Sequence, residues 1–249
     1  MLIDCNKKQL IEGFELYIQD FFDSKWRMKH MELLNNFEEH EWNKEMINKW
    51  YKSLEGKEPD YAVYKSSFFL IAGFYCYIKY TRKYIKQLYK NEISNTILSL
   101  CTNIVDVGNG TGHSTKALAE LFPDVEVYGT NINPSYQYQH NQYLQNKMIE
   151  LSNQQIDCFI FFEFMEHVFN PIEYINNIIK VHKPRVLIFA NSFNTRCIGH
   201  FIEYDCYGTI IPQKNISRKF NNKLKQLGYN QVKAGIWNNR PSIWINFEL

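Results

Sequence analysis

The spacing of apolar residues divides the chain into a helical first part and an alternating second part. Between residues 10 and 21, and again between residues 42 and 50, apolar side chains recur at intervals that predict amphipathic helices. Pro59 is the only proline before residue 123, so few breaks interrupt these helices. Asp60 is placed to cap a long helix, whose apolar positions are Tyr64, Phe68, Ala72 and Tyr75.

From residue 103 onward, short runs of β-branched and aromatic residues alternate with helical stretches. The runs predict strands at 103–107, 125–132, 156–162 and 185–190. The stretches between them predict helices at 113–121, from near residue 135, and at 171–181. This alternation favours a parallel sheet that is covered by helices on both faces.

The end of the chain has a different pattern. A helix is predicted at 216–227, and Gly228 follows it as a C-cap residue. Two short strands are then predicted, at 230–236 and 242–247, and only residues 237–241 separate them. Strands that follow each other so closely predict an antiparallel hairpin at the edge of the sheet.

Composition excludes several classes of protein. Apolar residues make up 45% of the 249 residues, which excludes disorder as the main state. The net charge of +2 provides no strongly basic surface for nucleic acid. The six cysteines form no CxxC pair, the first residues lack the pattern of a signal peptide, and the longest uncharged apolar stretch is 66–78. That stretch is shorter than the ~20 residues of a membrane-spanning helix, so the sequence predicts a cytoplasmic protein.

A glycine-rich loop at 106–112 carries the clearest chemical signal. Three of the eleven glycines lie within its last five residues, directly between a predicted strand and a predicted helix. Glycines at such a junction let the backbone approach a ligand, and the helix N-terminus offers free N–H groups. No GK[ST] follows, which excludes a phosphate-binding P-loop, and His113 breaks the dinucleotide pattern GxGxxG.

The loop resembles motif I of the class I S-adenosylmethionine-dependent methyltransferases, at Asp106, Gly108, Gly110 and Gly112. Three later segments resemble further motifs of the family, and the resemblance covers residues ~100 to 249. These segments are 127–134, 157–168 and 183–188. The resemblance implies a Rossmann-like α/β fold: a doubly wound, mostly parallel seven-stranded sheet with a C-terminal antiparallel hairpin. An all-helical cap would precede it.

The same resemblance implies which residues hold S-adenosylmethionine. Asp106 would orient the loop, and the loop backbone would pass under the methionine part of the cofactor, along Gly108, Asn109, Gly110, Thr111 and Gly112. The family's ribose-binding acidic residue corresponds here to Asn131, whose neutral amide makes weaker hydrogen bonds than a carboxylate. The family's third strand corresponds to 148–151, and Ser152 and Asn153 take the place of an aspartate near the adenine.

Carboxylates and histidines that follow the predicted strand at 156–162 are candidates for catalysis or metal binding. Glu163, Glu166 and His167 have the spacing that places three residues on one face of a helix. Two methyltransferase groups with a similar segment, the ubiquinone-biosynthesis O-methyltransferases and the small-RNA terminal 2′-O-methyltransferases, use it with a divalent metal. The resemblance therefore implies a candidate Mg²⁺ site, which His200 would complete; a purely structural role is the alternative. Without a metal, His200, Glu203 or Glu163 would be the general base.

Together, these features predict two units: a helical, substrate-selecting cap at 1–100 and an S-adenosylmethionine-binding methyltransferase domain at 101–249. The expected reaction is methyl transfer to an oxygen or nitrogen of a small molecule. Two alternatives stay open. One is a metal-assisted RNA ribose 2′-O-methyltransferase. The other is a non-catalytic binding protein that keeps the fold, and this alternative is favoured by Asn131 and by the short region of the third strand.

Overall fold

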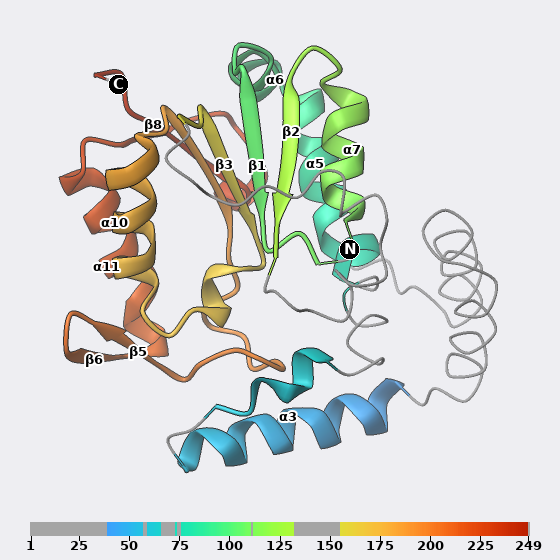
Figure 1. Ribbon diagram of the computed structural model, residues 1–249, viewed down its shortest axis with the longest axis vertical. Helices are drawn as coiled ribbons and strands as arrows, with labels where there is room; N and C mark the ends of the chain where they lie inside the picture. The colour runs from blue at the N-terminus through green and yellow to red at the C-terminus, as the bar shows by residue number, and fades with distance from the viewer. Residues whose placement is uncertain are drawn as a thin grey trace.

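A mixed sheet of six strands forms the centre of the protein, in the order β2-β1-β3-β4-β8-β7. The structure is a computed structural model that describes residues 39–56, 59–65, 73, 76–110, 112–131 and 155–248. Figure 1 shows the sheet and its labels. Its strands are β1 (Asn103–Val107), β2 (Glu126–Thr130), β3 (Cys158–Phe162), β4 (Val186–Ala190), β7 (Asn230–Val232) and β8 (Ser242–Ile245).

The pairing of these strands confirms the predicted α/β class. β1 lies parallel to β2 and β3, and β3 lies parallel to β4. β8 runs antiparallel to both β4 and β7, which confirms the C-terminal hairpin. The described residues contribute six strands to this sheet rather than the seven that we expected. The candidate for the missing strand, at 148–151, lies outside the described residues.

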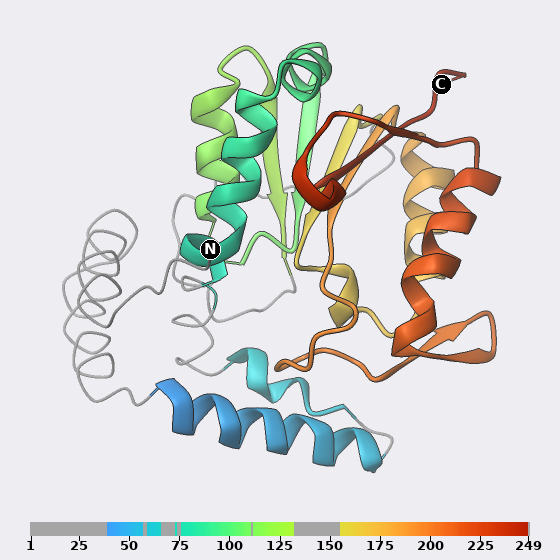
Figure 2. The same cartoon turned by 180° about the vertical axis from the view of Figure 1, so that it is seen from behind.

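Helices cover both faces of the sheet (Figures 1 and 2). On one face lie α5 (Arg82–Lys90), α6 (Glu92–Ser99) and α7 (His113–Leu121), and on the other lie α10 (Pro171–His182) and α11 (Gln213–Gln226). Strand residues alternate between the two: Phe159 and Leu187 pack with the α10 and α11 side, whereas Cys158 and Ile188 pack with the α5 to α7 side. Because both faces are covered, the two central strands β3 and β4 are apolar throughout.

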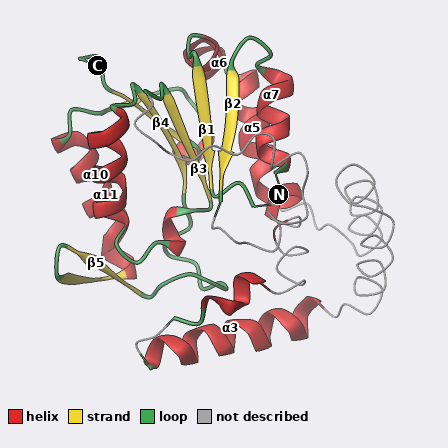
Figure 3. Cartoon of the chain, in the orientation of Figure 1, coloured by secondary structure: helices red, strands yellow, loops and turns green. Residues whose placement is uncertain are grey.

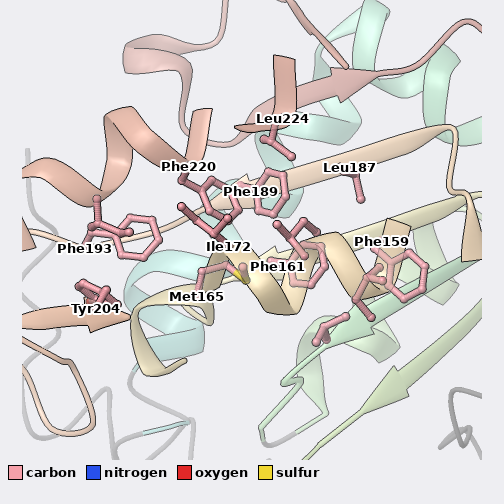
Figure 4. Packing of buried hydrophobic residues seen from close by; sticks show 14 of the residues in the cluster. Phe159, Phe161, Met165, Ile172, Leu187, Phe189, Phe193, Tyr204, Phe220 and Leu224 are labelled. Carbon is pink, nitrogen blue, oxygen red and sulfur yellow. The ribbon is translucent and has the colours of Figure 1, made fainter. Parts of the chain in front are cut away.

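The core on the α10 and α11 side is built from aromatic rings (Figure 4). Phe161 stacks on Phe189 with 4.9 Å between the ring centroids, and Phe189 meets Phe220 of α11 edge to face at 5.1 Å. Such pairs contribute about 0.5–1.5 kcal/mol beyond the burial of their area. The rings therefore fix α11 and the carboxyl halves of β3 and β4 relative to one another.

The helix α3 (Glu39–Glu55) lies across the carboxyl ends of the parallel strands in both views (Figures 1 and 2). It is joined there to the loop between β4 and β5: Trp50 Nε1 donates to the His200 carbonyl at 2.7 Å, and Tyr51 Oη donates to the Cys197 carbonyl at 3.4 Å. The indole of Trp50 is buried. The loop that carries His200 is thus held by the N-terminal part of the chain.

Between α3 and α5 the chain departs from the expected long helix. Asp60 Oδ1 accepts from the Ala62 backbone N–H at 3.0 Å, but the turn that it caps is the 3-10 segment η1 (Tyr61–Lys65). A π-helical turn, η2 (Tyr77–Thr81), then leads directly into α5. The prediction of a continuous α-helix from Asp60 was therefore wrong for 61–65, and residues 66–72 lie outside the described part of the chain.

A two-stranded sheet of β5 (Glu203–Cys206) and β6 (Thr209–Pro212) was not predicted. Its turn consists of Tyr207 and Gly208, both with positive φ (57° and 78°), as a two-residue hairpin requires. Figure 3 shows how helices and strands share the chain. In the segments that the structure describes, no helix has the length and apolar character needed to cross a membrane.

Truncation of a core ring should destabilise the protein strongly. We expect Phe161→Ala to lower the free energy of unfolding by about 3–5 kcal/mol, because it removes a fully buried ring and leaves a cavity. Phe247→Ala is the matched control, since that ring is 80% exposed and its loss should change stability by less than about 0.5 kcal/mol. Urea unfolding of both variants measures the difference, and equal losses would contradict the assignment of this core.

Candidate active site

The glycine loop adopts the conformation that its sequence predicts. Gly108, Gly110 and Gly112 all have positive φ, at 67°, 50° and 81°, where glycine is favoured. The loop begins directly after β1 and is tied to the end of β2, because the backbone N–H groups of Gly108 and Asn109 both donate to the Thr130 carbonyl. Gly112 is then the N-cap residue of α7.

Two glycines are required by close packing. A Cβ added to Gly108 would lie 2.2 Å from Cδ2 of Phe164, the residue that follows Glu163. A Cβ on Gly129 of β2 would lie 1.9 Å from the Asn109 side-chain nitrogen. Both distances are shorter than real Cβ contacts, so a side chain at either position would require Phe164 or Asn109 to move within a packed site. The first contact also places the glycine loop directly beside the segment with the candidate catalytic carboxylates.

Asp106 faces the interior rather than the open side of the loop. Its Oδ2 atom accepts from Ser114 Oγ at 2.5 Å and from Thr115 Oγ1 at 2.9 Å. Burial raises the pKa of Asp106 to about 6, although both hydroxyl hydrogen bonds lower it. This carboxyl group therefore fastens the end of β1 to the first turn of α7, and so orients the loop, as the resemblance implied.

Asn131 makes a contact that an aspartate could not make. Its Nδ2 atom donates to the Gly110 carbonyl at 3.2 Å, whereas a carboxylate has no proton to donate there. The amide thus ties the end of β2 to the middle of the glycine loop. Three other predicted cofactor residues, Thr111, Ser152 and Asn153, lie outside the described residues.

The loop fits S-adenosylmethionine where the structure describes it. Among the described residues, a Cβ on Gly110 would meet no atom nearer than the Gly108 carbonyl oxygen at 4.0 Å, so none of them fills the space beside this part of the backbone. The same turn leads into the N-terminus of α7, whose backbone N–H groups favour polar and anionic groups. A ligand with a carboxylate and an amine, such as the methionine end of the cofactor, suits this combination.

A second polar group lies where β3 and β4 end. Glu163 directly follows β3 and has φ of 48°, a left-handed conformation that is unusual for a residue with a side chain. Glu166 and His167 belong to the next turn, the 3-10 segment η3 (Met165–His167). The prediction that Glu163, Glu166 and His167 share one helical face was therefore wrong, because the chain turns sharply at Glu163 before the helical turn begins.

Each Glu163 oxygen is engaged by neighbours. Tyr84 Oη donates to Oε1 at 2.9 Å, Arg240 Nη2 donates to the same oxygen, and Ser192 Oγ donates to Oε2. Glu166 is fully buried, and its Oε1 accepts from the Ser192 backbone N–H at 2.8 Å. Burial first, and then the Glu163 charge, raises the pKa of Glu166 well above its usual range.

The two histidines meet edge to face, with 4.7 Å between their ring centroids. His200 Nδ1 lies 2.7 Å from the Thr195 carbonyl, which can only accept, so Nδ1 carries the proton and Nε2 keeps its lone pair. His167 Nδ1 bonds with the Tyr64 hydroxyl at 2.9 Å. Burial lowers the pKa of both rings, so both are neutral at pH 7.

Several residues at this edge were not predicted from the sequence. Arg240 is the most consequential, and a signal for it existed: the linker between two antiparallel C-terminal strands must return to the carboxyl edge, and Arg240 is its only charged residue. Ser192, Tyr84 and Tyr64 carried no such signal. Glu203, a predicted catalytic residue, is exposed at the start of β5, and no described contact joins it to Glu163.

The predicted metal ligands lie in one region but do not form a donor set that fits Mg²⁺. Glu163 is paired with a guanidinium, and its two oxygens already accept hydrogen bonds from Tyr84, Ser192 and Arg240. Within the described ranges, no group of three or more His, Cys, Asp and Glu side chains could hold a metal ion. We therefore derive no chemical step through a metal.

A family model described as a methyltransferase domain matches residues 77–238. The chain belongs to this family. The match confirms the resemblance that the glycine loop and the later motifs suggested. It begins with η2 and ends within η4 (Trp237–Asn239), so it includes the glycine loop and most of the polar residues at the strand ends.

One curated relative is the mitochondrial ubiquinone biosynthesis O-methyltransferase of Dictyostelium discoideum, which is 28% identical over 138 residues. The alignment covers 47% of this chain and 42% of that protein. Among solved structures, an O-methyltransferase family protein from Burkholderia thailandensis is 8% identical with a TM-score of 0.44, over 70% of this chain and 57% of that one. The mitomycin 7-O-methyltransferase MmcR is 13% identical with a TM-score of 0.46, over 71% and 55%.

The burial of Asp106 should make stability fall as pH rises. The folded protein keeps this proton up to a pKa of about 6, whereas an unperturbed carboxyl group loses it near 3.8. Folding therefore becomes less favourable between these values, by roughly 1–3 kcal/mol. We expect wild type to lose stability relative to Asp106→Asn over this interval, as measured by urea unfolding at a series of pH values.

Asp157→Asn is the control with the opposite sign. Burial raises the pKa of Asp157, but the Thr102 backbone N–H and Arg185 outweigh it and hold the pKa below its usual value. The stability that ionised Asp157 adds to the folded protein is therefore present above the usual pKa of an aspartate and is lost as pH falls below it. An Asp106 difference that is flat with pH, or that follows the sign of Asp157, would contradict the burial of a protonated Asp106.

Proposed function

We propose that this protein transfers a methyl group from S-adenosylmethionine to the hydroxyl oxygen of a small-molecule acceptor. The observation that carries the proposal is the contact between Gly108 and Phe164, which places the cofactor-type loop beside the buried polar residues at the ends of β3 and β4. Membership of the methyltransferase family supports the proposal, and so does the similarity to a curated O-methyltransferase. Transfer to nitrogen is the other acceptor chemistry that we predicted.

The bound donor would supply an electrophilic methyl group on a sulfonium. Most of the catalysis then comes from holding the acceptor in line with that group. Gly108, Asn109, Gly110 and Gly112 would hold the donor, and Asn131 would keep the loop in place by its bond to the Gly110 carbonyl. A hydroxyl acceptor must also lose its proton as the oxygen–carbon bond forms.

His200 is the base in this proposal. Its Nδ1 proton is fixed on the Thr195 carbonyl, its Nε2 lone pair is available, and its lowered pKa keeps the ring neutral. Glu163 is less suited, because Tyr84, Ser192 and Arg240 already donate to its oxygens. Glu203 is less suited because it is exposed on β5.

The sequence predicted a cap at 1–100, and we now propose that the cap is the part of the chain before η2. The start of the family match at residue 77, and the packing of α5 and α6 into the core of the sheet together with α7, support placing these helices in the methyltransferase domain. Of the cap, α3 and η1 are described, and both reach the histidines through Trp50 and Tyr64. A cap in this position would select the acceptor. A cytoplasmic location stays a prediction.

Cofactor binding tests the proposal directly. We expect calorimetric titration to show micromolar binding of S-adenosylmethionine and S-adenosylhomocysteine, and Gly110→Arg to abolish it. The new side chain would fill the open space beside the loop and would strain a residue with φ of 50°. Gly208→Arg is the matched control, because Gly208 also has positive φ and open surroundings but lies in the β5–β6 turn.

The absence of binding at millimolar cofactor would contradict the proposal and favour a non-catalytic binding protein. With binding established, a screen of small hydroxyl and amine acceptors, together with short RNA, identifies the acceptor class. Transfer to RNA that weakens steeply with salt would instead support the ribose 2′-O-methyltransferase alternative.

Removal of the proposed base should affect the reaction and not the binding of the donor. We expect His200→Gln to lower kcat by about 10²- to 10⁴-fold while the dissociation constant of S-adenosylmethionine stays unchanged. His182→Gln is the control, since His182 is also buried but packs on Phe159 in the core. An unchanged kcat in His200→Gln would remove His200 from the mechanism.

A further inference from the structure

Arg240 brings a fixed positive charge to the carboxyl and imidazole groups at the strand ends. Its Nη2 atom donates to Glu163 Oε1 and to Ser192 Oγ, and its guanidinium lies over the Tyr84 ring, 5.5 Å from the centroid. The Glu163 side chain is 12% exposed, and that of Arg240 is 35% exposed. Charges that are partly removed from water in this way interact more strongly than a surface ion pair.

The contacts of Glu163 use most of its capacity to accept. Tyr84 and Arg240 occupy Oε1, and Ser192 occupies Oε2, out of about four lone-pair directions of a carboxylate. Ser192 links the set together, because its hydroxyl receives from Arg240 and donates to Glu163 while its backbone N–H donates to Glu166. Arg240, Glu163 and Ser192 are therefore bonded to one another in a ring of hydrogen bonds, and Glu166 is attached to it through Ser192.

The same guanidinium lies close to a further residue that the sequence suggested as a metal ligand. Ser192 accepts from Arg240 Nη2 through its hydroxyl and donates to Glu166 Oε1 through its backbone N–H, so Glu166 belongs to the same hydrogen-bonded group. A divalent cation bound among these side chains would stand beside a guanidinium and would be repelled by it. Arg240 and a metal ion are thus alternatives at this place, and the sequence supplies Arg240.

We propose that the guanidinium of Arg240 takes the part of a divalent cation at this site, so that methyl transfer by this protein needs no metal. The metal in question is the one that the pattern of Glu163, Glu166, His167 and His200 suggests. This proposal rests on the proposed function, and it names Arg240 as the positive charge that holds Glu163 in place. Arg240 is a positioning residue in this account, since it acts through Glu163 and Ser192.

Manganese binding tests this proposal without donor or acceptor. Mn²⁺ alone is titrated into the full-length chain, and free Mn²⁺ is measured by electron paramagnetic resonance. We expect no stoichiometric Mn²⁺ binding by wild type. We expect Arg240→Ala to bind one Mn²⁺ per chain at least about tenfold more tightly, because Glu163 is released from its counter-ion. Glu163→Gln in the Arg240→Ala background should remove the new site.

Two single variants control for charge and for the loss of any arginine. Arg240→Lys keeps a positive charge at the site and should bind as little Mn²⁺ as wild type. Arg185→Ala removes an arginine that pairs with Asp157 at 3.3 Å, away from Glu163, and should also gain nothing. Far-ultraviolet circular dichroism establishes that each variant is folded before titration.

Stoichiometric Mn²⁺ binding by wild type that is lost in Glu163→Gln would overturn the proposal, whatever the variants at 240 do. A folded Arg240→Ala that gains no site would overturn it as well. In the active enzyme, transfer should proceed at an unchanged rate in EDTA, and a rate that collapses in EDTA and returns with Mg²⁺ would contradict it. Because the Mn²⁺ titration needs no methyl transfer, failure of the proposed reaction leaves its result readable.

Discussion

The ion pair between Glu163 and Arg240 connects the three strands on which the candidate active site depends. Glu163 follows β3, Ser192 follows β4, and Arg240 precedes β8, and these strands are neighbours in the sheet. The pair also holds Glu163 in a left-handed backbone conformation, which costs of order 1 kcal/mol and persists only where surrounding contacts enforce it. Removal of one partner would leave a shielded charge without its counter-ion, which generally costs several kcal/mol.

Around this pair, two parts of the chain far apart in sequence converge on the histidines. The N-terminal segments provide Trp50 and Tyr64, which hold the His200 backbone and the His167 ring. Arg196 of the same loop lies over the Tyr51 ring at 4.3 Å. The loop after β4 is thus packed between the sheet and α3. The geometry of the proposed base therefore depends on α3 and η1 as well as on the loop after β4, and a change in α3 can alter the reaction without touching the acceptor.

Sequence patterns predicted the elements that are determined by residues close together in the sequence, or by burial on both faces of the sheet. β1 and α7 have the predicted bounds, because an apolar strand, a glycine loop and a helix start follow one another without ambiguity. Asp106 faces Ser114 and Thr115, eight and nine residues away, as a loop-orienting residue should. The hairpin β5–β6 was missed because each of its strands has only four residues, which is too short for an alternating pattern to stand out in the sequence.

What the sequence could not provide was contact between distant residues. Glu163 and Arg240 are separated by 77 positions, and Tyr64 and His167 by 103, so no local spacing relates them. The spacing of Glu163, Glu166 and His167 did suggest a helical face and a metal. The sharp turn at Glu163 ends the expected helical face, and it places the Glu163 carboxylate on Arg240, where the pattern had suggested a metal. The glycine loop, by contrast, was predicted because its function lies in consecutive backbone atoms.

We propose that the glycine loop and the polar residues at the strand ends form one site for methyl transfer. A crystal structure of the protein with S-adenosylhomocysteine would test this arrangement. We expect the ligand along Gly108 to Gly112, with its sulfur directed toward the edge where Phe164 meets the loop and with Arg240 still on Glu163. A ligand bound elsewhere, or one whose sulfur points away from Glu163 and His200, would contradict it.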